Sequence, residues 1–173
     1  MENRFGFIRE KLDIKILILF ITKRLTAPVD FDTLSALTLC DDGISYFDFA
    51  ECVDELVETD HLYFDGEKYV ITDKGKRNGD VTESSIPYSV RLKAEKSTAA
   101  LNAEIARNAM ITTGKEIRRG GGFDVNMSLS DGLGEILSMH LYAGSEKQAE
   151  AIEEGFRKNA ESIYNMIINK IFE

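Results

Sequence analysis

The sequence predicts an α+β fold with a helical N-terminal half, one long linking helix, and a small three-stranded antiparallel sheet covered by a C-terminal helix. Three patterns support this prediction. Residues 12–78 follow the order helix, short helix, helix and hairpin, residues 86–108 keep one helical pattern, and residues 110–142 alternate with a period of two. These changes of pattern predict domains over residues 1–80, 81–108 and 109–173.

The charge balance restricts the function. The chain of 173 residues is 43% hydrophobic, enough for a sizeable core, and carries a formal net charge of −9. Residues 1–80 hold 10 Lys and Arg against 17 Asp and Glu, a net charge of −7. Nucleic-acid-binding domains usually show a basic patch, so this balance argues against non-specific binding to a polyanion.

The most apolar run, residues 12–21, is too short for a membrane span, which needs roughly 20 residues. It is also interrupted by Asp13 and Lys15. The N-terminal residues show no secretory signal, and the two cysteines predict no disulfide scaffold. We therefore expect a cytoplasmic protein that does not enter a membrane.

Capping residues mark the helices of the first half. A helix is predicted over residues 12–25 and ends before Pro28. Asp30 is the expected N-cap of a short second helix. Ser45 is the expected N-cap of a third helix, with Asp48 at the position of a capping-box partner.

A hairpin signal follows the third helix. Asp65-Gly66, flanked by apolar alternation, predicts two short strands joined by a tight turn. Thr72 is the expected N-cap of one more helical turn. The succession over residues 12–78 is the order of a winged helix-turn-helix.

The third helix, residues 46–59, carries an acidic arc opposite its apolar side. In a winged helix this element usually enters the DNA groove, where phosphate contacts from Lys and Arg supply most of the affinity. Three interpretations remain open: a solvated helix face, a protein-interaction surface that includes Phe47, and direct reading of DNA. The protein-interaction surface would consist of Phe47, Asp48, Glu51 and Glu55, and the arc also contains Asp54 and Glu58.

Basic side chains follow in the hairpin and in the turn after it. They are contacts for a DNA backbone or else ordinary surface charge. If DNA is bound, we expect these cations, and not the acidic helix, to make the contacts. They are Lys68, Lys74, Lys76 and Arg77.

The segment over residues 81–87 is predicted to be a linker before the long helix. Ser84 or Ser85 is its expected N-cap, and Pro87 lies in its first turn. One side of this helix carries a narrow stripe that resembles a coiled-coil seam. We therefore expect it to pack against another copy of itself or against the last helix of a partner subunit, in a homodimer. The stripe is Val90, Ala94, Ser97, Leu101, Ile105 and Asn108.

The last third predicts a meander under a helix. Four alternate residues of the middle strand are expected to face a helix over residues 145–172, with Phe156 midway along it. The end of this helix is apolar nearly all round, which predicts a second contact surface. The four inward residues are Phe123, Val125, Met127 and Leu129.

No pattern indicates an active site. The glycine-rich stretch over residues 118–123 joins two strands and lacks the Lys-Ser/Thr of a phosphate-binding loop, so we expect a flexible hairpin loop. Cys40, Cys52 and His61 lack the close spacing of zinc ligands. His140 has no Ser or Cys in a triad context. We therefore predict no enzymatic activity, no metal and no cofactor.

Two segments, "GISYFDFAECVDELVETDHLYFDGEKYVITDKGK" and "QAEAIEEGFRKNAESIYNMIINKI", resemble an uncharacterised bacterial family, number 4364 among the domains of unknown function. The resemblance covers most of the chain and implies a winged-helix, transcriptional-regulator-like protein. More distantly, residues 12–78 look like the DNA-binding domains of the PadR and MarR regulators. We therefore expect a regulator-like homodimer that binds double-stranded DNA, or alternatively a winged-helix protein-interaction module that does not.

Overall fold

The computed structural model describes residues 7–173, which form six α-helices and two antiparallel sheets. The fold is α+β, as the sequence predicts. The chain divides into two compact units, an N-terminal unit over residues 1–103 and a C-terminal unit over residues 104–173. Across the described residues, no helix combines the length and apolar character that a membrane span requires.

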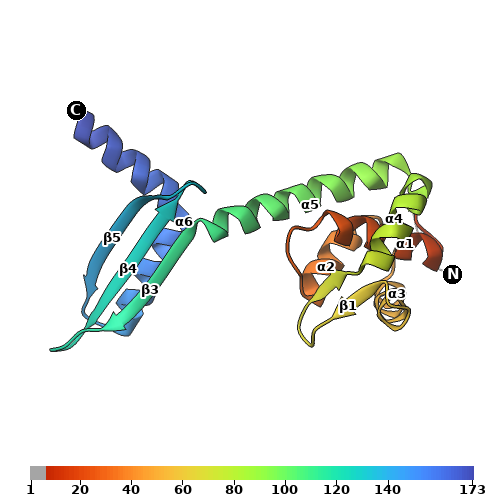
Figure 1. Cartoon of the computed structure of the whole chain (residues 1–173), viewed down its shortest axis with the longest axis horizontal. Coiled ribbons are helices and arrows are strands. Elements are labelled where there is room, and N and C mark those ends of the chain that lie inside the picture. Colours follow the sequence, from red (N-terminus) through yellow and green to blue (C-terminus); the bar gives the residue numbers. More distant parts are fainter. Residues whose placement is uncertain (1–6) are drawn as a thin grey trace. The chain divides into compact units, whose positions relative to one another are not determined.

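The N-terminal unit contains four helices, a two-stranded hairpin and the start of a long fifth helix (Figure 1). Three predicted N-caps are confirmed, because Asp30, Ser45 and Thr72 each accept a hydrogen bond from a backbone N–H three residues on. The elements are α1 (Lys11–Arg24), α2 (Phe31–Thr38), α3 (Tyr46–Glu58), β1 (Leu62–Phe64), β2 (Tyr69–Ile71), α4 (Asp73–Thr82) and α5 (Tyr88–Ala109).

Helix α1 is the centre of this unit. It is apolar on most sides and packs against α2, α3 and α4, so that residues all round it are buried. Phe49 of α3 and Leu62 of β1 complete the core from the other elements. This explains why the apolar run over residues 12–21 belongs to a globular core.

The hairpin is confirmed, with a loop of residues 65–68 between the strands. The Asp65 carboxylate accepts the backbone N–H groups of Glu67 and Lys68, at 2.9 and 2.7 Å, and Gly66 supplies the positive φ of 106° that the turn requires. Val29 forms an additional antiparallel bridge to Tyr69 of β2. The short segment before α2 therefore pairs with β2 of the hairpin, at the place where a third strand would lie.

The predicted single turn after Thr72 is wrong in length, because α4 has ten residues. Its two glycines would disfavour a helix in isolation, yet Gly75 allows close packing: a Cβ there would lie 2.2 Å from the carbonyl oxygen of His61. The predicted linker is also wrong. It is occupied by the end of α4 and a 3-10 turn, Glu83–Ser85, in which the Ser85 hydroxyl donates to the Thr82 carbonyl instead of capping α5.

The predicted seam on α5 is partly wrong. Val90 and Ala94 are buried in the core of their own unit, and Leu101 packs against it. Thr98 is the buried residue of the next turn, whereas Ser97 is exposed. The side chain of Asn102 bonds the backbone at Arg24 and Thr26 and so fixes this side of α5. Half of the stripe, Val90, Ala94 and Leu101, therefore packs within the chain.

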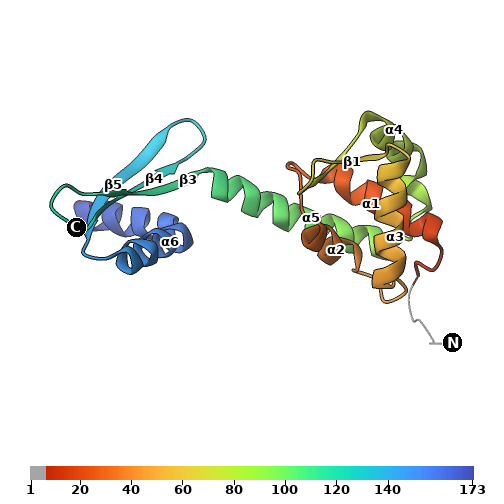
Figure 2. The same cartoon turned by 90° about the horizontal axis from the view of Figure 1, so that it is seen from below.

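The C-terminal unit is an antiparallel meander with one covering helix. The strand order is β3-β4-β5, and α6 runs along one face of the sheet (Figure 2). The prediction for this face is confirmed, since Val125, Met127, Leu129 and Phe156 are all buried in one core, with Phe123 partly buried at its edge. The elements are β3 (Ile111–Ile117), β4 (Phe123–Ser130), β5 (Glu135–Ala143) and α6 (Glu146–Phe172).

Candidate interaction face of the N-terminal unit

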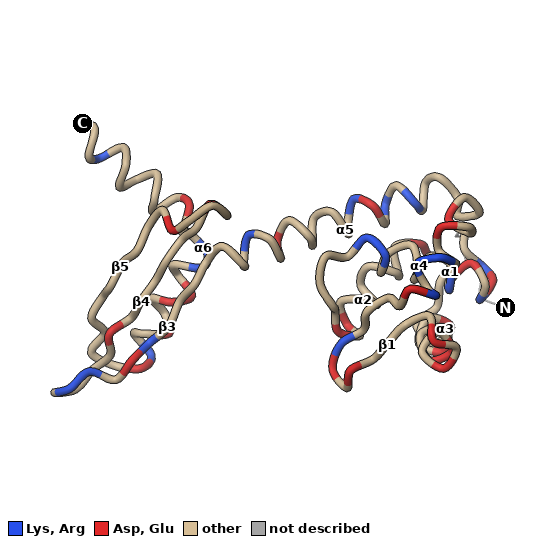
Figure 3. The backbone as a smooth tube through the Cα atoms, viewed as in Figure 1, with Lys and Arg blue, Asp and Glu red and all other residues tan. Residues whose placement is uncertain are grey.

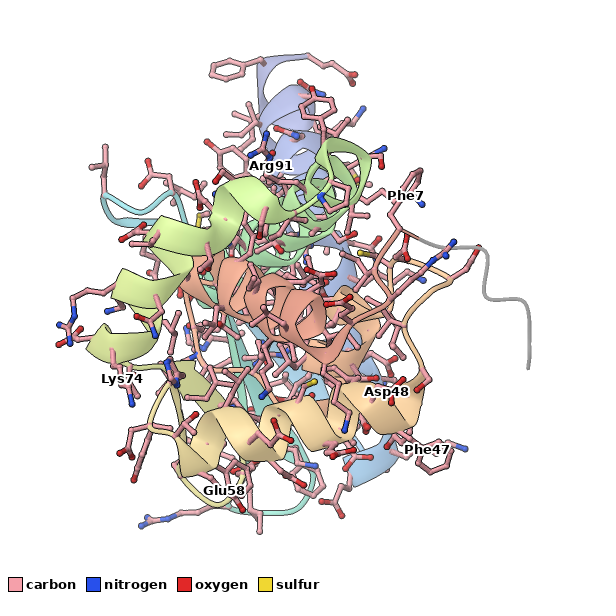
Figure 4. The ribbon with its side chains drawn as sticks, turned by 90° about the vertical axis from the view of Figure 1, so that its right-hand side faces the viewer. Phe7, Phe47, Asp48, Glu58, Lys74 and Arg91 are labelled. Carbon is pink, nitrogen blue, oxygen red and sulfur yellow. The ribbon has the colours of Figure 1, made fainter. Side chains whose placement is uncertain are left out.

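Helix α3 presents one outward line of side chains. Phe47, Glu51, Asp54 and Glu58 are spaced by four, three and four residues, which places them along a single helical stripe. Phe47 is 82% exposed and projects from one end of the helix, while Glu58 lies at the other end (Figure 4). The predicted acidic arc is therefore a real surface feature of this helix (Figure 3).

Two of the predicted interaction residues are paired within the chain. Glu51 forms an ion pair with Lys11 of α1, and Glu55 forms one with Lys15. The hydrogen bond from Lys15 lowers the pKa of Glu55, and the hydrogen bond to Glu51 raises the pKa of Lys11. These carboxylates therefore help to hold α3 against α1, a pairing between residues 40 positions apart that helical periodicity does not reveal.

The remaining carboxylates differ in their partners. Asp48 lies beside the N-cap, where its carboxylate accepts the Ser45 hydroxyl at 2.6 Å. Asp54 and Glu58 are exposed and make no ion pair within residues 7–173. The charge that α3 offers to another molecule therefore comes mainly from Asp54 and Glu58, which the predicted interaction set did not include.

A continuous row of aromatic rings borders this line, and we call it the aromatic strip. Phe31, the first residue of α2, lies 6.0 Å from Tyr46 and 6.3 Å from Tyr69 between ring centroids. Tyr46 lies 6.1 Å from Phe47, and Tyr69 stacks on Phe64 at 4.6 Å. The rings therefore run from the start of α3, across the start of α2, to the hairpin.

The aromatic strip is apolar yet largely open to solvent. Tyr46, Phe47 and Phe64 are exposed, whereas Phe31 and Tyr69 are half-buried. Burial and the nearby charge of Asp54 both raise the pKa of Tyr69. The carboxylate line and the aromatic strip therefore share one face.

The four predicted cations, Lys68, Lys74, Lys76 and Arg77, differ in their contacts. Lys74 donates to the Thr59 carbonyl at 2.7 Å, at the C-terminal end of α3, where a cation interacts favourably with the helix dipole. Lys76 pairs with Asp73 at 3.4 Å. Lys68 and Arg77 are exposed and make no ion pair in the part of the chain that the structure describes. Two of the four predicted cations therefore have a polar partner within the chain.

The residues considered as metal ligands do not come together in one site among the described residues. Cys52 is buried beneath α1, and burial raises its pKa to about 11. The His61 ring is held between Thr59 and Asn78, at 2.9 and 2.6 Å. Among the described residues, no three His, Cys, Asp or Glu side chains are grouped as metal ligands.

In the C-terminal unit, His140 and the glycine loop have local partners. His140 bonds the Asn126 side chain across the sheet at 2.6 Å. The three glycines of the loop, Gly120 to Gly122, all have positive φ, and the Arg118 side chain before them lies over the Tyr142 ring. The loop is a glycine-specific turn between two strands.

A family model described as "Domain of unknown function (DUF4364)" matches residues 14–171. No curated protein and no solved structure matches the chain.

Proposed function

The chain belongs to the family defined by the domain of unknown function DUF4364, and we propose that it is a transcriptional-regulator-like protein whose N-terminal unit is a winged helix that binds a partner protein. The order α1, α2, α3 and hairpin supports the winged helix. The Val29 bridge to Tyr69 supports it further, because it adds the short strand that lies between the first two helices.

One observation favours a protein over DNA as the partner. The face of α3 offers Phe47, Asp54 and Glu58 to the solvent, beside the aromatic strip. DNA would bring closely spaced phosphates against those carboxylates, and three cations that could offset this repulsion, Lys11, Lys15 and Lys76, are paired with acids of the chain. Exposed aromatic side chains, in contrast, are enriched where proteins bind one another.

The chemistry of the face specifies its partner in general terms. A protein that carries Arg or Lys among apolar side chains would match both the carboxylates of α3 and the aromatic strip. A guanidinium can pair with a carboxylate and can also stack on an aromatic ring. Such a surface also rejects acidic partners by like-charge repulsion.

Variant-dependent capture tests this function. The full chain is used as bait in a lysate of cells that carry it, and each captured protein is measured again with a Phe47→Ala, Asp54→Lys variant. We expect a partner that binds the wild type and is lost from the double variant. Tyr88→Ala is the matched control, because Tyr88 is an exposed aromatic residue of the same unit outside this face. Partners that bind all three proteins equally would contradict the proposal.

A second candidate function is contact with the DNA backbone, favoured by the exposure of Lys68 and Arg77. Fluorescence anisotropy with a double-stranded probe at about 50 mM salt measures it under conditions where phosphate contacts are strong. Binding that is lost in a Lys68→Ala, Arg77→Ala variant would establish this function in place of the first. We expect no binding by the wild type.

A further inference from the structure

A pocket lies beside β2 in the N-terminal unit, and we call it the β2 pocket. Its walls are residues 22–23 and 25–28, which end α1 and lead toward α2, residues 69–71 of β2, and Lys76 of α4. Its volume is about 300 Å³, at the lower end of the range for small-molecule sites. At about 30 Å³ for each water molecule, the pocket has room for roughly ten non-hydrogen atoms.

The β2 pocket exists because the strand pairing beside β2 stops early. Val29 and Tyr69 exchange two backbone hydrogen bonds, at 2.7 and 3.2 Å, and this bridge is isolated. In that antiparallel register, Ala27 would be the next partner and would lie opposite Ile71. The chain leaves β2 instead, and the side chain of Asn102 holds its backbone toward α5. The end of β2 is therefore left without a neighbouring strand on this side.

The backbone of Ile71 faces the β2 pocket. Backbone groups of alternate strand residues point to the same side, so the N–H and C=O of Ile71 point the same way as those of Tyr69, away from β1. The next residue obeys this alternation, since the Thr72 N–H donates to the His61 carbonyl at 3.1 Å on the β1 side. Across the described residues, no backbone group on the pocket side pairs with Ile71. The sheet edge thus offers a ligand one donor and one acceptor.

The lining of the β2 pocket is positively charged. Lys23 and Lys76 belong to it, whereas no Asp or Glu is among the described residues that form it. Lys23 already pairs with Asp80. Lys76 makes only a solvent-exposed pair with Asp73 at 3.4 Å, a kind of pair that contributes little to stability. Its ammonium group can therefore turn to a ligand, and the pocket favours an anion.

Apolar side chains complete the lining, from Leu25, Ala27, Pro28 and Val70. A matching ligand needs an anionic group for the lysine and the free N–H, a donor for the free carbonyl, and an apolar body. A carboxylate accepts hydrogen bonds from both an ammonium group and a backbone N–H. A hydroxyl suits the carbonyl better than a second ammonium group would, because two lysines and no carboxylate line the pocket.

We propose that the β2 pocket binds a small α-hydroxy monocarboxylate with a branched apolar body. The hydroxyl, the α-carbon and the carboxylate of such an acid have the same spacing as the N, Cα and C=O of one residue. The ligand thus makes with Ile71 the pair of hydrogen bonds that Ala27 does not make, while its carboxylate also binds Lys76. Its branched body lies against Leu25 and Pro28. This site does not depend on the partner that binds the α3 face.

An amide-resolved NMR titration of the full chain with α-hydroxyisovalerate tests the site. We expect saturable shifts that are largest at the amide of Ile71, with no shift at Val125 in the other unit and a dissociation constant on the order of 1 mM. Valine has an ammonium group in place of the hydroxyl, and α-hydroxyisovaleramide lacks the charge. Each should bind at least about fivefold more weakly. No saturable shift at Ile71, or equal binding of either analogue, would overturn the proposal.

Three variants test the assignment of the lining residues in the same titration. Lys76→Gln removes the available cation from an exposed position and should raise the dissociation constant at least about fivefold. Ala27→Leu fills the pocket without a change of charge and should abolish the shift at Ile71. Lys93→Gln is the matched control, because Lys93 is an exposed lysine of the same unit outside the pocket, and it should bind like the wild type. Equal affinities for Lys76→Gln and Lys93→Gln would contradict the site.

Discussion

The two units close their cores in different ways. In the N-terminal unit, α1 is surrounded by α2, α3, α4 and the first half of α5, so its apolar residues are buried on all sides. In the C-terminal unit a single helix lies on one face of three strands, and Leu141 of β5 and the last residues of α6, Ile171 and Phe172, keep apolar side chains in contact with water. The central helix of the first unit is therefore covered from several directions, whereas the core of the second unit is covered by one helix alone.

The largest expected effects come from truncating one aromatic residue in each core. Phe49→Ala and Phe156→Ala should each lower the free energy of unfolding by about 3–5 kcal/mol. Phe49 should cost more, because it is enclosed by several elements, whereas Phe156 packs only between α6 and the sheet. Urea denaturation followed by circular dichroism measures both. A larger loss for Phe156 would contradict the difference between the two cores.

A smaller effect is expected from two identical substitutions in α4. Gly75→Ala should destabilise by about 1–3 kcal/mol, because the new Cβ would meet the His61 carbonyl oxygen at 2.2 Å. Gly79→Ala should stabilise by about 0.5–1 kcal/mol, since its nearest neighbour, Leu19 Cβ, is at 3.7 Å and alanine favours the helix. Thermal unfolding of the two variants should shift in opposite directions. Stabilisation by both substitutions would show that α4 is packed less closely at Gly75 than these distances imply, and destabilisation by both would show that Gly79 has less room.

In the N-terminal unit, a buried carboxylate also holds the first described residues of the chain against the core. Asp41 accepts the backbone N–H groups of Phe7, Ile8 and Gly43, at 3.2, 3.1 and 3.0 Å. Asp41→Asn should cost about 1 kcal/mol, because bonds to a charged acceptor become bonds to a neutral amide. Hydrogen exchange should then quicken at Ile8 while the amide of Val125 in the other unit stays unchanged. Faster exchange in both units would show that they do not unfold independently.

The smallest expected effect concerns pH. Burial, with a contribution from the charge of Lys74, lowers the pKa of His61 in the folded chain below its ordinary value of 6.5. The folded state therefore binds the proton less well than the unfolded state, so this contribution to stability is complete above pH 6.5 and is lost as the pH falls through the folded pKa. The melting temperature of His61→Gln should decline less than that of the wild type between pH 7.5 and 5. Equal declines would remove His61 as a cause.

Local signals in the sequence predicted most of the fold. The caps at Asp30, Ser45 and Thr72, the hairpin at Asp65-Gly66 and the period of two in β4 each depend on neighbours along the chain, which a sequence displays directly. The length of α4 was not predicted, because Gly75 and Gly79 both disfavour a helix locally, and the close packing of Gly75 against the His61 carbonyl depends on the folded structure.

The candidate face was less predictable, because its composition depends on partners far away in the sequence. The acidic arc could be located by helical periodicity alone. Which carboxylates stay available could not, since Glu51 and Glu55 pair with Lys11 and Lys15 some 40 residues earlier. The aromatic strip was missed for the same reason, because its rings come from α2, α3 and the hairpin.

The aromatic strip also has a spectroscopic consequence. The chain contains no tryptophan, so an indole introduced at Phe47 would be its only one and would sit on a side chain that is 82% exposed to water. Its emission would be red-shifted in the free protein and would move to shorter wavelengths when another molecule covered the face. A single Phe47→Trp substitution thus converts the end of α3 into an optical reporter of occupancy, readable in solution without a label and without knowing in advance what binds.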